Sequence, residues 1–306
     1  MATDFQGVVE QGNIDDYEIV RKISTLGRGK YAELFEGIDV TDFRRCIIKS
    51  PNPMGRKRVR REMEILRALR GGPNILECLD VVWDPCTESS SIIFDYFENT
   101  DYRALYPRFD TNDNRYYMRE LLKALEFCHR QQIMHRDVRP PNIMIDHNQR
   151  KLRLFGWDYA EYYVPHTQYS VRAGRFFRPP ELLLDYEEYD CSVDMWNLGS
   201  MFASMIFRRD PFFHGNSRFD QIEKIASVLG TKGLFNYIER YDMDGSDQID
   251  GMQVFEQRAW SSFVNEENSR LVDDCAIDLV DKLLRWDHKE RITARQALEH
   301  AYFTGN

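Results

Sequence analysis

The chain has 306 residues, a length that fits one large domain or a pair of lobes better than several independent domains. With 42% hydrophobic and 30% charged residues it has a globular composition, and its apolar runs are too short to cross a bilayer, so we expect no membrane partner. The net charge of -9 argues against a specific nucleic-acid binder, and the six cysteines, which form no C-x-x-C pairs, argue against a zinc site. No targeting peptide is recognisable, which argues against secretion, so we expect the cytoplasm and nucleus.

The first third of the chain has the pattern of a small sheet with one long helix. Short runs rich in β-branched and aromatic residues predict strands at residues 17–23, 32–40, 46–49, 75–83 and 91–97. Between the third and fourth runs, Val59, Met63, Leu66 and Leu69 recur at helical spacing. They predict an amphipathic helix over residues 58–70.

Helical patterns dominate the rest of the chain. They predict helices over residues 114–131, 194–207 and 275–286, separated by loops rich in Gly, Pro and Asp. We therefore predict a bilobal α+β fold, with a small β-rich N-terminal lobe over about residues 1–98 and a larger helical lobe over about residues 99–306. A ligand shared by the two lobes would bind in the cleft between them.

A glycine-rich segment lies between the first two predicted strands. Gly27 and Gly29 begin a G-x-G-x-x-G pattern whose third position is Ala32, and such glycines let backbone amides approach phosphates. Alone, the pattern would indicate a plain β-turn. Lys49 in the third strand and Glu62 in the helix follow at the spacing of two residues that pair in protein kinases, where the lysine contacts the phosphates of ATP.

The segment IMHRDVRPPNIMI matches the H-R-D-x-x-x-x-N catalytic loop at His135, Arg136, Asp137 and Asn142. Asp137 would orient the attacking hydroxyl and accept its proton, and the amide oxygen of Asn142 would hold a metal ion on the phosphates. The alternative, in which Asp137 only caps a turn, fits the surrounding sequence less well. The usual lysine two residues after the aspartate is Arg139, which keeps the positive charge in a bulkier side chain.

The sequence also resembles one kinase family in particular. The strings LGRGKY, RGGPNI, KALEFCH, DHNQRKLRL and ASMIFRRDPFFHG are similar to the casein kinase 2 catalytic (alpha) subunit family, and the resemblance runs from Val8 to Phe303. It implies a protein kinase that binds ATP with magnesium and phosphorylates Ser or Thr in acidic sequences.

The resemblance further implies roles for individual residues. Catalytic roles fall on Asp137, Lys49, Glu62 and Arg139. ATP-binding roles fall on Gly27, Gly29, Lys49, Phe94 and Asp95. In kinases the glutamate at the end of the activation segment, here Glu181, forms a structural pair with an arginine that corresponds to Arg291.

The chain departs from the family at a magnesium ligand. The family carries D-W-G, but here the residues are Gly156, Trp157 and Asp158, so glycine stands where an aspartate would coordinate magnesium. Magnesium requires oxygen ligands at about 2.0–2.1 Å, so a carboxylate two residues further along cannot simply substitute. Period-two alternation would still point residues 156 and 158 to similar sides, which makes Asp158 a candidate metal ligand beside Asn142. We expect weakened magnesium binding and a rate reduced on the order of 10²–10⁴ or more.

Further basic residues correspond to positions with which the family recognises acidic side chains near the Ser or Thr of the substrate. They are Arg172, Arg175 and Arg178 in the activation segment, and Arg56, Lys57 and Arg58 in a basic block. Arginine forks suit carboxylates, so acidic protein substrates are expected. By its residues alone, the basic block is equally well a solvated helix face.

The family also assembles with a regulatory beta subunit through apolar residues of the N-terminal lobe. Ile19, Phe35 and Ile48 fall at similar positions, although they are equally well explained as strand core residues. Two hypotheses follow. The retained catalytic residues favour a Ser/Thr kinase of reduced activity, whereas Gly156 and Arg139 favour a pseudokinase that binds nucleotide or the regulatory subunit.

Overall fold

The structure is a computed structural model of the chain, and it describes residues 12–23, 32–52, 55–170, 176–243, 249 and 251–305, except for the side chains of residues 56 and 57. Contacts within the chain define two compact units. The first comprises Met1–Tyr102 and Pro141–Ala160, and the second comprises Arg103–Pro140 and Glu161–Asn306.

This division differs from the single boundary predicted near residue 98, because residues 141–160 return to the first unit. Backbone hydrogen bonds hold them there. The amide of Leu76 donates to the carbonyl of Leu154 at 3.1 Å, and the amide of Thr100 donates to the carbonyl of Ile145 at 3.0 Å. A pattern taken along the chain could not show that this segment comes back.

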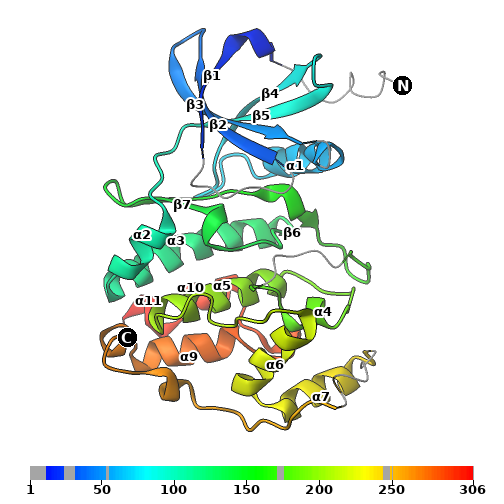
Figure 1. Ribbon diagram of the computed structural model, residues 1–306, viewed down its shortest axis with the longest axis vertical. Coiled ribbons are helices and arrows are strands. Elements are labelled where there is room, and N and C mark those ends of the chain that lie inside the picture. Colours follow the sequence, from blue (N-terminus) through cyan, green and yellow to red (C-terminus); the bar gives the residue numbers. More distant parts are fainter. Residues whose placement is uncertain are drawn as a thin grey trace. The chain divides into compact units, whose positions relative to one another are not determined.

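The first unit contains a five-stranded antiparallel sheet in the order β1-β2-β3-β5-β4 (Figure 1). Its strands are β1 (Tyr17–Lys22), β2 (Ala32–Asp39), β3 (Arg44–Pro51), β4 (Cys78–Asp84) and β5 (Ser89–Asp95). Each overlaps a run of β-branched and aromatic residues that predicted a strand, so these predictions are confirmed. β3 pairs with β2 on one side and β5 on the other, so it lies inside the sheet, and Cys46, Ile47, Ile48 and Lys49 are all buried.

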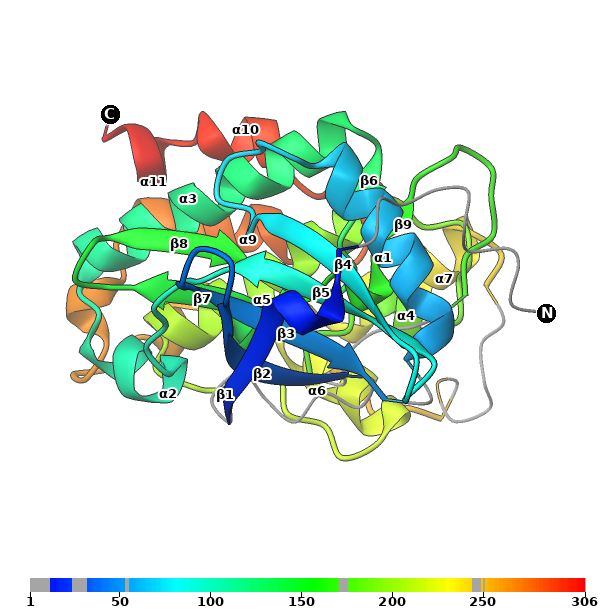
Figure 2. The same ribbon diagram turned by 90° about the horizontal axis from the view of Figure 1, so that it is seen from above.

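The helix α1 (Arg56–Ala68) follows β3 and lies beside β4 and β5, as Figure 2 shows from above. The four apolar residues that predicted a helix here are buried, with exposures of 8% or less: Val59, Met63, Leu66 and Leu69. They form the apolar stripe of an amphipathic helix, and this stripe places the opposite face of α1 toward solvent.

The returning segment adds a hairpin and two short turns to the first unit. The turn η3 (Pro140–Asn142) leads into β7 (Ile143–Asp146), which pairs with β8 (Lys151–Leu154). After β8 the chain makes the 3-10 turn η4 (Trp157–Tyr159), which packs against α1. Gly156 and Asp158 are therefore not part of a strand.

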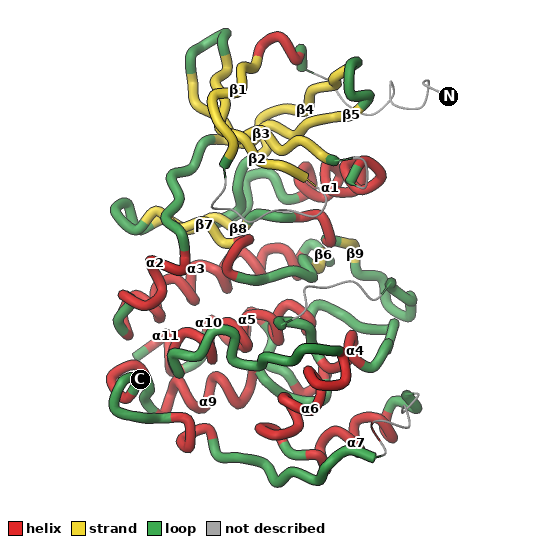
Figure 3. Tube along the Cα trace, in the orientation of Figure 1, coloured by secondary structure: helices red, strands yellow, loops and turns green. Residues whose placement is uncertain are grey.

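The second unit is mainly helical, as the colouring of Figure 3 shows. Its longer helices are α3 (Thr111–Arg130), α5 (Ser192–Ile206), α6 (Arg218–Leu229), α7 (Thr231–Arg240) and α9 (Asp274–Leu283). Shorter elements are α2 (Tyr102–Leu105), which crosses the boundary, then β6 (Ile133–Met134), β9 (Glu161–Tyr162), α4 (Pro180–Leu183), α10 (Ala294–Leu298) and α11 (Ala301–Thr304).

The helix α5 lies in the core of the second unit, because every residue from Val193 to Ile206 is buried. The helix α3 begins with a capping box, in which Asp110 and Asp113 each accept a hydrogen bond from the other's backbone amide. Among the described helices, none is both long and apolar enough to cross a membrane. The predicted fold, an α+β kinase-like arrangement with a β-rich first part and a helical second part, is confirmed.

Candidate active site

Lys49 and Glu62 form a buried ion pair within the first unit. The ammonium nitrogen Nζ of Lys49 lies 2.6 Å from Oε1 and 2.8 Å from Oε2 of Glu62. The two residues are 4% and 2% exposed, respectively. The pairing of β3 with β2 and β5 fixes Lys49 in register opposite Leu34 and Ile92, so the sheet holds the lysine and α1 supplies its partner.

Asp158 is a second partner of the same lysine. Its Oδ2 lies 2.8 Å from Nζ of Lys49, and η4 brings it there by packing against α1. Burial opposes the charge of both groups, but the two carboxylates raise the pKa of Lys49, and Lys49 holds the pKa of Asp158 below its usual value. Burial raises the pKa of Glu62 to about 7, against the lowering effect of Lys49.

Gly156 lies beside Asn142 and adopts a left-handed backbone conformation, with φ of 82°. A Cβ atom added to Gly156 would come 2.5 Å from Oδ1 of Asn142. A side chain at position 156 would thus begin next to the asparagine, whereas the carboxylate at position 158 contacts Lys49. The strand alternation from which similar sides were expected does not apply here, because η4 replaces the strand geometry on which it depended.

Few side-chain oxygens of the described residues at this place are available to magnesium. Asn142 offers one amide oxygen, Gly156 offers no side chain, and the carboxylate of Asp158 is paired with Lys49. Across the described ranges, no group of three or more His, Cys, Asp or Glu side chains could hold a metal ion. Magnesium prefers several oxygen ligands in octahedral order, so the arrangement fits it poorly.

In the second unit, Asp137 is buried at 6% exposure and contacts Arg139. Nε of Arg139 donates to Oδ2 of Asp137 at 2.9 Å. The predicted base and the arginine that replaces lysine are thus brought together. An arginine held in this way competes for an oxygen that would otherwise accept a proton from a hydroxyl.

The loop that carries Asp137 is anchored by Asp194 at the start of α5. Oδ2 of Asp194 accepts from the amide of His135 at 2.9 Å, and Oδ1 accepts from the amide of Arg136 at 2.7 Å. His129 at the end of α3 also lies 2.9 Å from Oδ2. Burial opposes the charge, but the hydrogen bond from His129 and these amides hold the pKa of Asp194 below its usual value. His129 carries no motif, and the sequence alone did not indicate it.

Arg136 is fixed by its own contacts. It has a left-handed backbone with φ of 64°, and its Nη1 donates to the hydroxyl of Tyr189 at 2.7 Å. That hydroxyl donates in turn to the carbonyl of Ser170 at 2.9 Å. This connection ties the loop that carries Asp137 to the segment after β9.

A fully buried ion pair joins α4 to the chain before α10. Nη1 and Nη2 of Arg291 each donate to one oxygen of Glu181 at 2.6 Å, and both side chains are 0% exposed. Nη2 also donates to the carbonyl of Trp286 at 3.2 Å. The pair that the resemblance implied is present, and its geometry is bidentate.

The remaining residues predicted to bind ATP or the substrate differ in burial and in their contacts. Phe94 is 0% exposed and packs edge to face on Phe155, with ring centroids 5.3 Å apart. Asp95 is exposed, and Arg178 is partly buried. The guanidinium of Arg58 lies 5.2 Å from the centre of the Tyr159 ring, so at least this member of the basic block contacts η4.

Several predicted residues lie outside the part of the chain that the structure describes. They are Gly27, Gly29, Arg172, Arg175 and the side chains of Arg56 and Lys57. Their roles remain predictions from the sequence.

The three apolar residues assigned to subunit contact differ in exposure. Ile48 is 5% exposed and belongs to a buried cluster with Cys46, so it is a core residue. Phe35 is partly buried and packs on the same cluster. Ile19 is 58% exposed and its neighbour Val20 is 53% exposed. Of the three residues, only Ile19 on β1 is therefore exposed.

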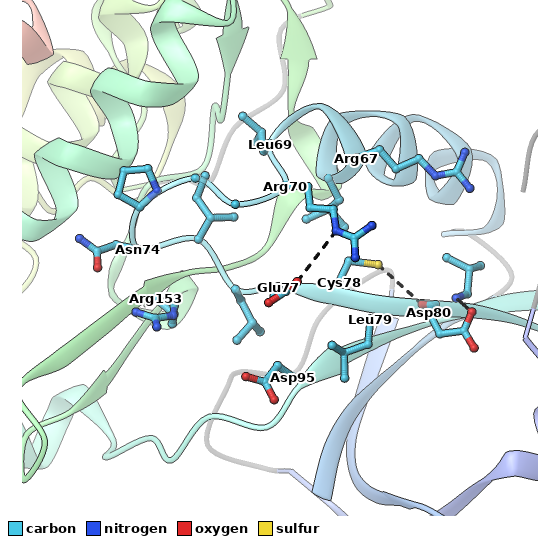
Figure 4. Close-up of a pocket in the computed structure, with 17 residues that line it drawn as sticks. Arg67, Leu69, Arg70, Asn74, Glu77, Cys78, Leu79, Asp80, Asp95 and Arg153 are labelled. Carbon is cyan, nitrogen blue, oxygen red and sulfur yellow. Dashed lines mark hydrogen bonds and ion pairs between the residues drawn. The ribbon is translucent and has the colours of Figure 1, made fainter. Parts of the chain in front are cut away.

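A separate hollow of about 530 Å³ lies in the first unit, between the end of α1 and the start of β4 (Figure 4). Its charged lining includes Arg70 and Glu77, whose Nε and Oε1 atoms are 4.0 Å apart, and Asp95. Neither Lys49 nor Asp158 lines it. The hollow is thus distinct from the site that contains the lysine.

One comparison with known proteins identifies the family. The family model described as "Protein kinase domain" matches residues 20–303, which is nearly the whole chain. The matched range includes both the Lys49–Glu62 pair and the loop that carries Asp137.

Proposed function

The chain belongs to the protein kinase domain family, and from this premise we propose that it is a Ser/Thr kinase similar to the casein kinase 2 catalytic subunit, with reduced activity. Protein kinase domains bind ATP with magnesium and transfer its γ-phosphoryl group to a protein hydroxyl. The observation that carries the proposal is the buried Lys49–Glu62 pair at 2.6 Å, because an active kinase requires it.

Several residues of the chain have separate roles in the proposed reaction. Lys49 supplies positive charge for the phosphates of ATP, and Glu62 holds its ammonium group in place. Asp137 orients the substrate hydroxyl and accepts its proton, on a loop that Asp194 anchors. Magnesium would neutralise phosphate charge in a family member, and the missing carboxylate at Gly156 is the reason that we propose a reduced rate.

We propose that the substrates are proteins with acidic residues around the target Ser or Thr. The basic residues of the activation segment and of the block that begins α1 support this proposal, since arginine pairs well with carboxylates. We also propose that the exposed apolar side chains of β1, Ile19 and Val20, bind a regulatory beta subunit. Both assignments extend the resemblance to the casein kinase 2 family.

The test is phosphotransfer to an acidic Ser/Thr peptide and to the same peptide with its acids replaced by their amides. We expect slow transfer that prefers the acidic peptide and that Asp137→Asn abolishes. Asp278→Asn is the matched control, because Asp278 forms an exposed ion pair with Lys282 and takes no part in the site. Wild-type transfer no faster than that of Asp137→Asn with every metal tried would instead indicate a binding module.

A further inference from the structure

Lys49 carries one positive charge but contacts two carboxylates. Glu62 and Asp158 lie 2.6 Å and 2.8 Å from its ammonium nitrogen. The side chains of Lys49 and Glu62 are 5% and 2% exposed, whereas that of Asp158 is 24% exposed. Of the two carboxylates, Asp158 is thus the more exposed to solvent. It can separate from the lysine at the lower cost in free energy, because water can solvate its charge.

The reversed tripeptide explains why this second carboxylate is present. A side chain at position 156 would start beside Asn142, while the side chain at position 158 reaches Lys49. Exchanging aspartate and glycine between the two positions therefore moves one negative charge from the asparagine to the lysine. The change removes a metal ligand and adds a competitor for the phosphates.

We propose that Asp158 is an internal counter-ion of Lys49, which must separate from the lysine before nucleotide phosphates can bind there, and that this chain binds nucleotide without requiring magnesium. The inference rests on the proposed nucleotide binding. It deepens that function by naming the residue that sets nucleotide affinity and the form of nucleotide that is bound.

The groups that face Asp158 come from three elements. β3 supplies Lys49, and α1 supplies Glu62 and Arg58, whose positive charge also acts on Asp158. The backbone of η4 itself contributes a hydrogen bond. When Asp158 leaves Lys49, Arg58 remains as a neighbouring positive charge, so the displaced carboxylate is not left alone.

The size of the effect follows from how often Lys49 is released. If Lys49 is free of Asp158 in about one molecule in ten, the apparent dissociation constant for a nucleotide is about tenfold weaker than the intrinsic one. Asp158→Asn removes the charge with little change in shape, so it should recover about this factor. Magnesium should change the wild-type affinity by less than about twofold, because few oxygen ligands remain to hold it.

The experiment is calorimetric titration of the whole chain with ATP and ADP, in the presence of magnesium and of a chelator. We expect Asp158→Asn to bind both nucleotides about tenfold more tightly than wild type in the chelator. Asp158→Gly is the second variant, since the family carries glycine at this position. Wild-type binding that requires magnesium or manganese, or an affinity unchanged by both substitutions, would overturn the proposal.

A second measurement tests the contact without nucleotide. Trace acetylation by acetic anhydride across a pH series reports the pKa of each lysine by mass spectrometry. We expect Asp158→Asn to lower the pKa of Lys49 and to leave that of Lys289 unchanged. Asp190→Asn is the matched control, because Asp190 pairs with Lys289 at 2.6 Å and raises its pKa, so this substitution should lower only the pKa of Lys289.

The two measurements separate the possible failures. Nucleotide binding by neither wild type nor Asp158→Asn at millimolar concentration would overturn the proposed nucleotide binding, and this proposal with it. An unchanged pKa of Lys49 in Asp158→Asn would overturn only the counter-ion role.

Discussion

Restoring a carboxylate at position 156 should raise the rate of phosphotransfer. In the structure, Gly156 lies where a side chain would begin beside Asn142, so Gly156→Asp places an acidic group next to the amide oxygen that remains. The carboxylate of Asp158 would still occupy Lys49 in this single variant. The double variant Gly156→Asp with Asp158→Gly should therefore be faster than the single one.

Two opposing effects set the magnitude. The left-handed backbone at residue 156 costs a non-glycine residue about 1–2 kcal/mol, although aspartate tolerates it better than most. The new Cβ would lie 2.5 Å from Oδ1 and 2.6 Å from Cγ of Asn142, so the asparagine side chain must shift to make room. Against this cost, a recovered rate factor on the order of 10²–10⁴ corresponds to about 3–5 kcal/mol of barrier. The strain lowers the stability of the folded chain and leaves the barrier unchanged, so we expect a net increase in rate in a variant that folds.

The assay is the initial rate on an acidic Ser/Thr peptide for wild type, the single variant and the double variant. Each is measured with magnesium, with manganese and with a chelator, and Asp137→Ala supplies the background. Thermal unfolding checks that the variants fold. A wild-type rate equal to that of an ordinary kinase, abolished by Asp158→Ala, would refute the reasoning, because Asp158 would then be the metal ligand. If the double variant shows no phosphotransfer, the defect lies elsewhere, and Arg139, which contacts Asp137, is the next residue to test.

Three further outcomes are expected. Ile19→Asp should abolish co-purification with a regulatory beta subunit, whereas Phe43→Asp, at another exposed apolar residue of the same unit, should not; equal binding by both would contradict the β1 assignment. Glu181→Gln should lower the free energy of unfolding in urea by about 3–5 kcal/mol, because it leaves Arg291 buried with no opposite charge, and a loss below 1 kcal/mol would be inconsistent with that. Because the pKa of Glu62 is raised to about 7 from 4.5, the folded state retains a proton that the unfolded chain loses, so this carboxyl makes stability fall as pH rises through that interval. Unfolding at several pH values should show that Glu62→Gln removes this decline, and an unchanged slope would count against the raised pKa.

Much of the first unit could be predicted because its signals are local. The spacing of Val59, Met63, Leu66 and Leu69 predicted α1, and all four are buried. The pairing of Lys49 with Glu62 followed from motif spacing, although that spacing gave no indication of burial or distance.

The partner of Asp158 could not be predicted in the same way. Its position depends on how the chain turns after β8, and the expected strand alternation failed because η4 takes its place. Likewise, His129 contacts Asp194 across 65 residues of sequence, and neither residue's neighbours indicate the contact. Interactions that depend on the return of distant segments leave no periodic signal in the sequence.

The interleaving of the two units has a consequence for the order in which the chain folds during synthesis. The ribosome makes the N-terminus first, but the first unit needs residues 141–160, which are made only after Arg103–Pro140 of the second unit has emerged. Until then a nascent chain lacks Asp158, and Lys49 has Glu62 as its carboxylate partner. The second unit is completed later still, because Arg291, the partner of Glu181, is synthesised 110 residues after it. If synthesis stalls after Glu181 and before Arg291, the first unit has all the residues it needs to fold. The second unit then still lacks the arginine that pairs with Glu181.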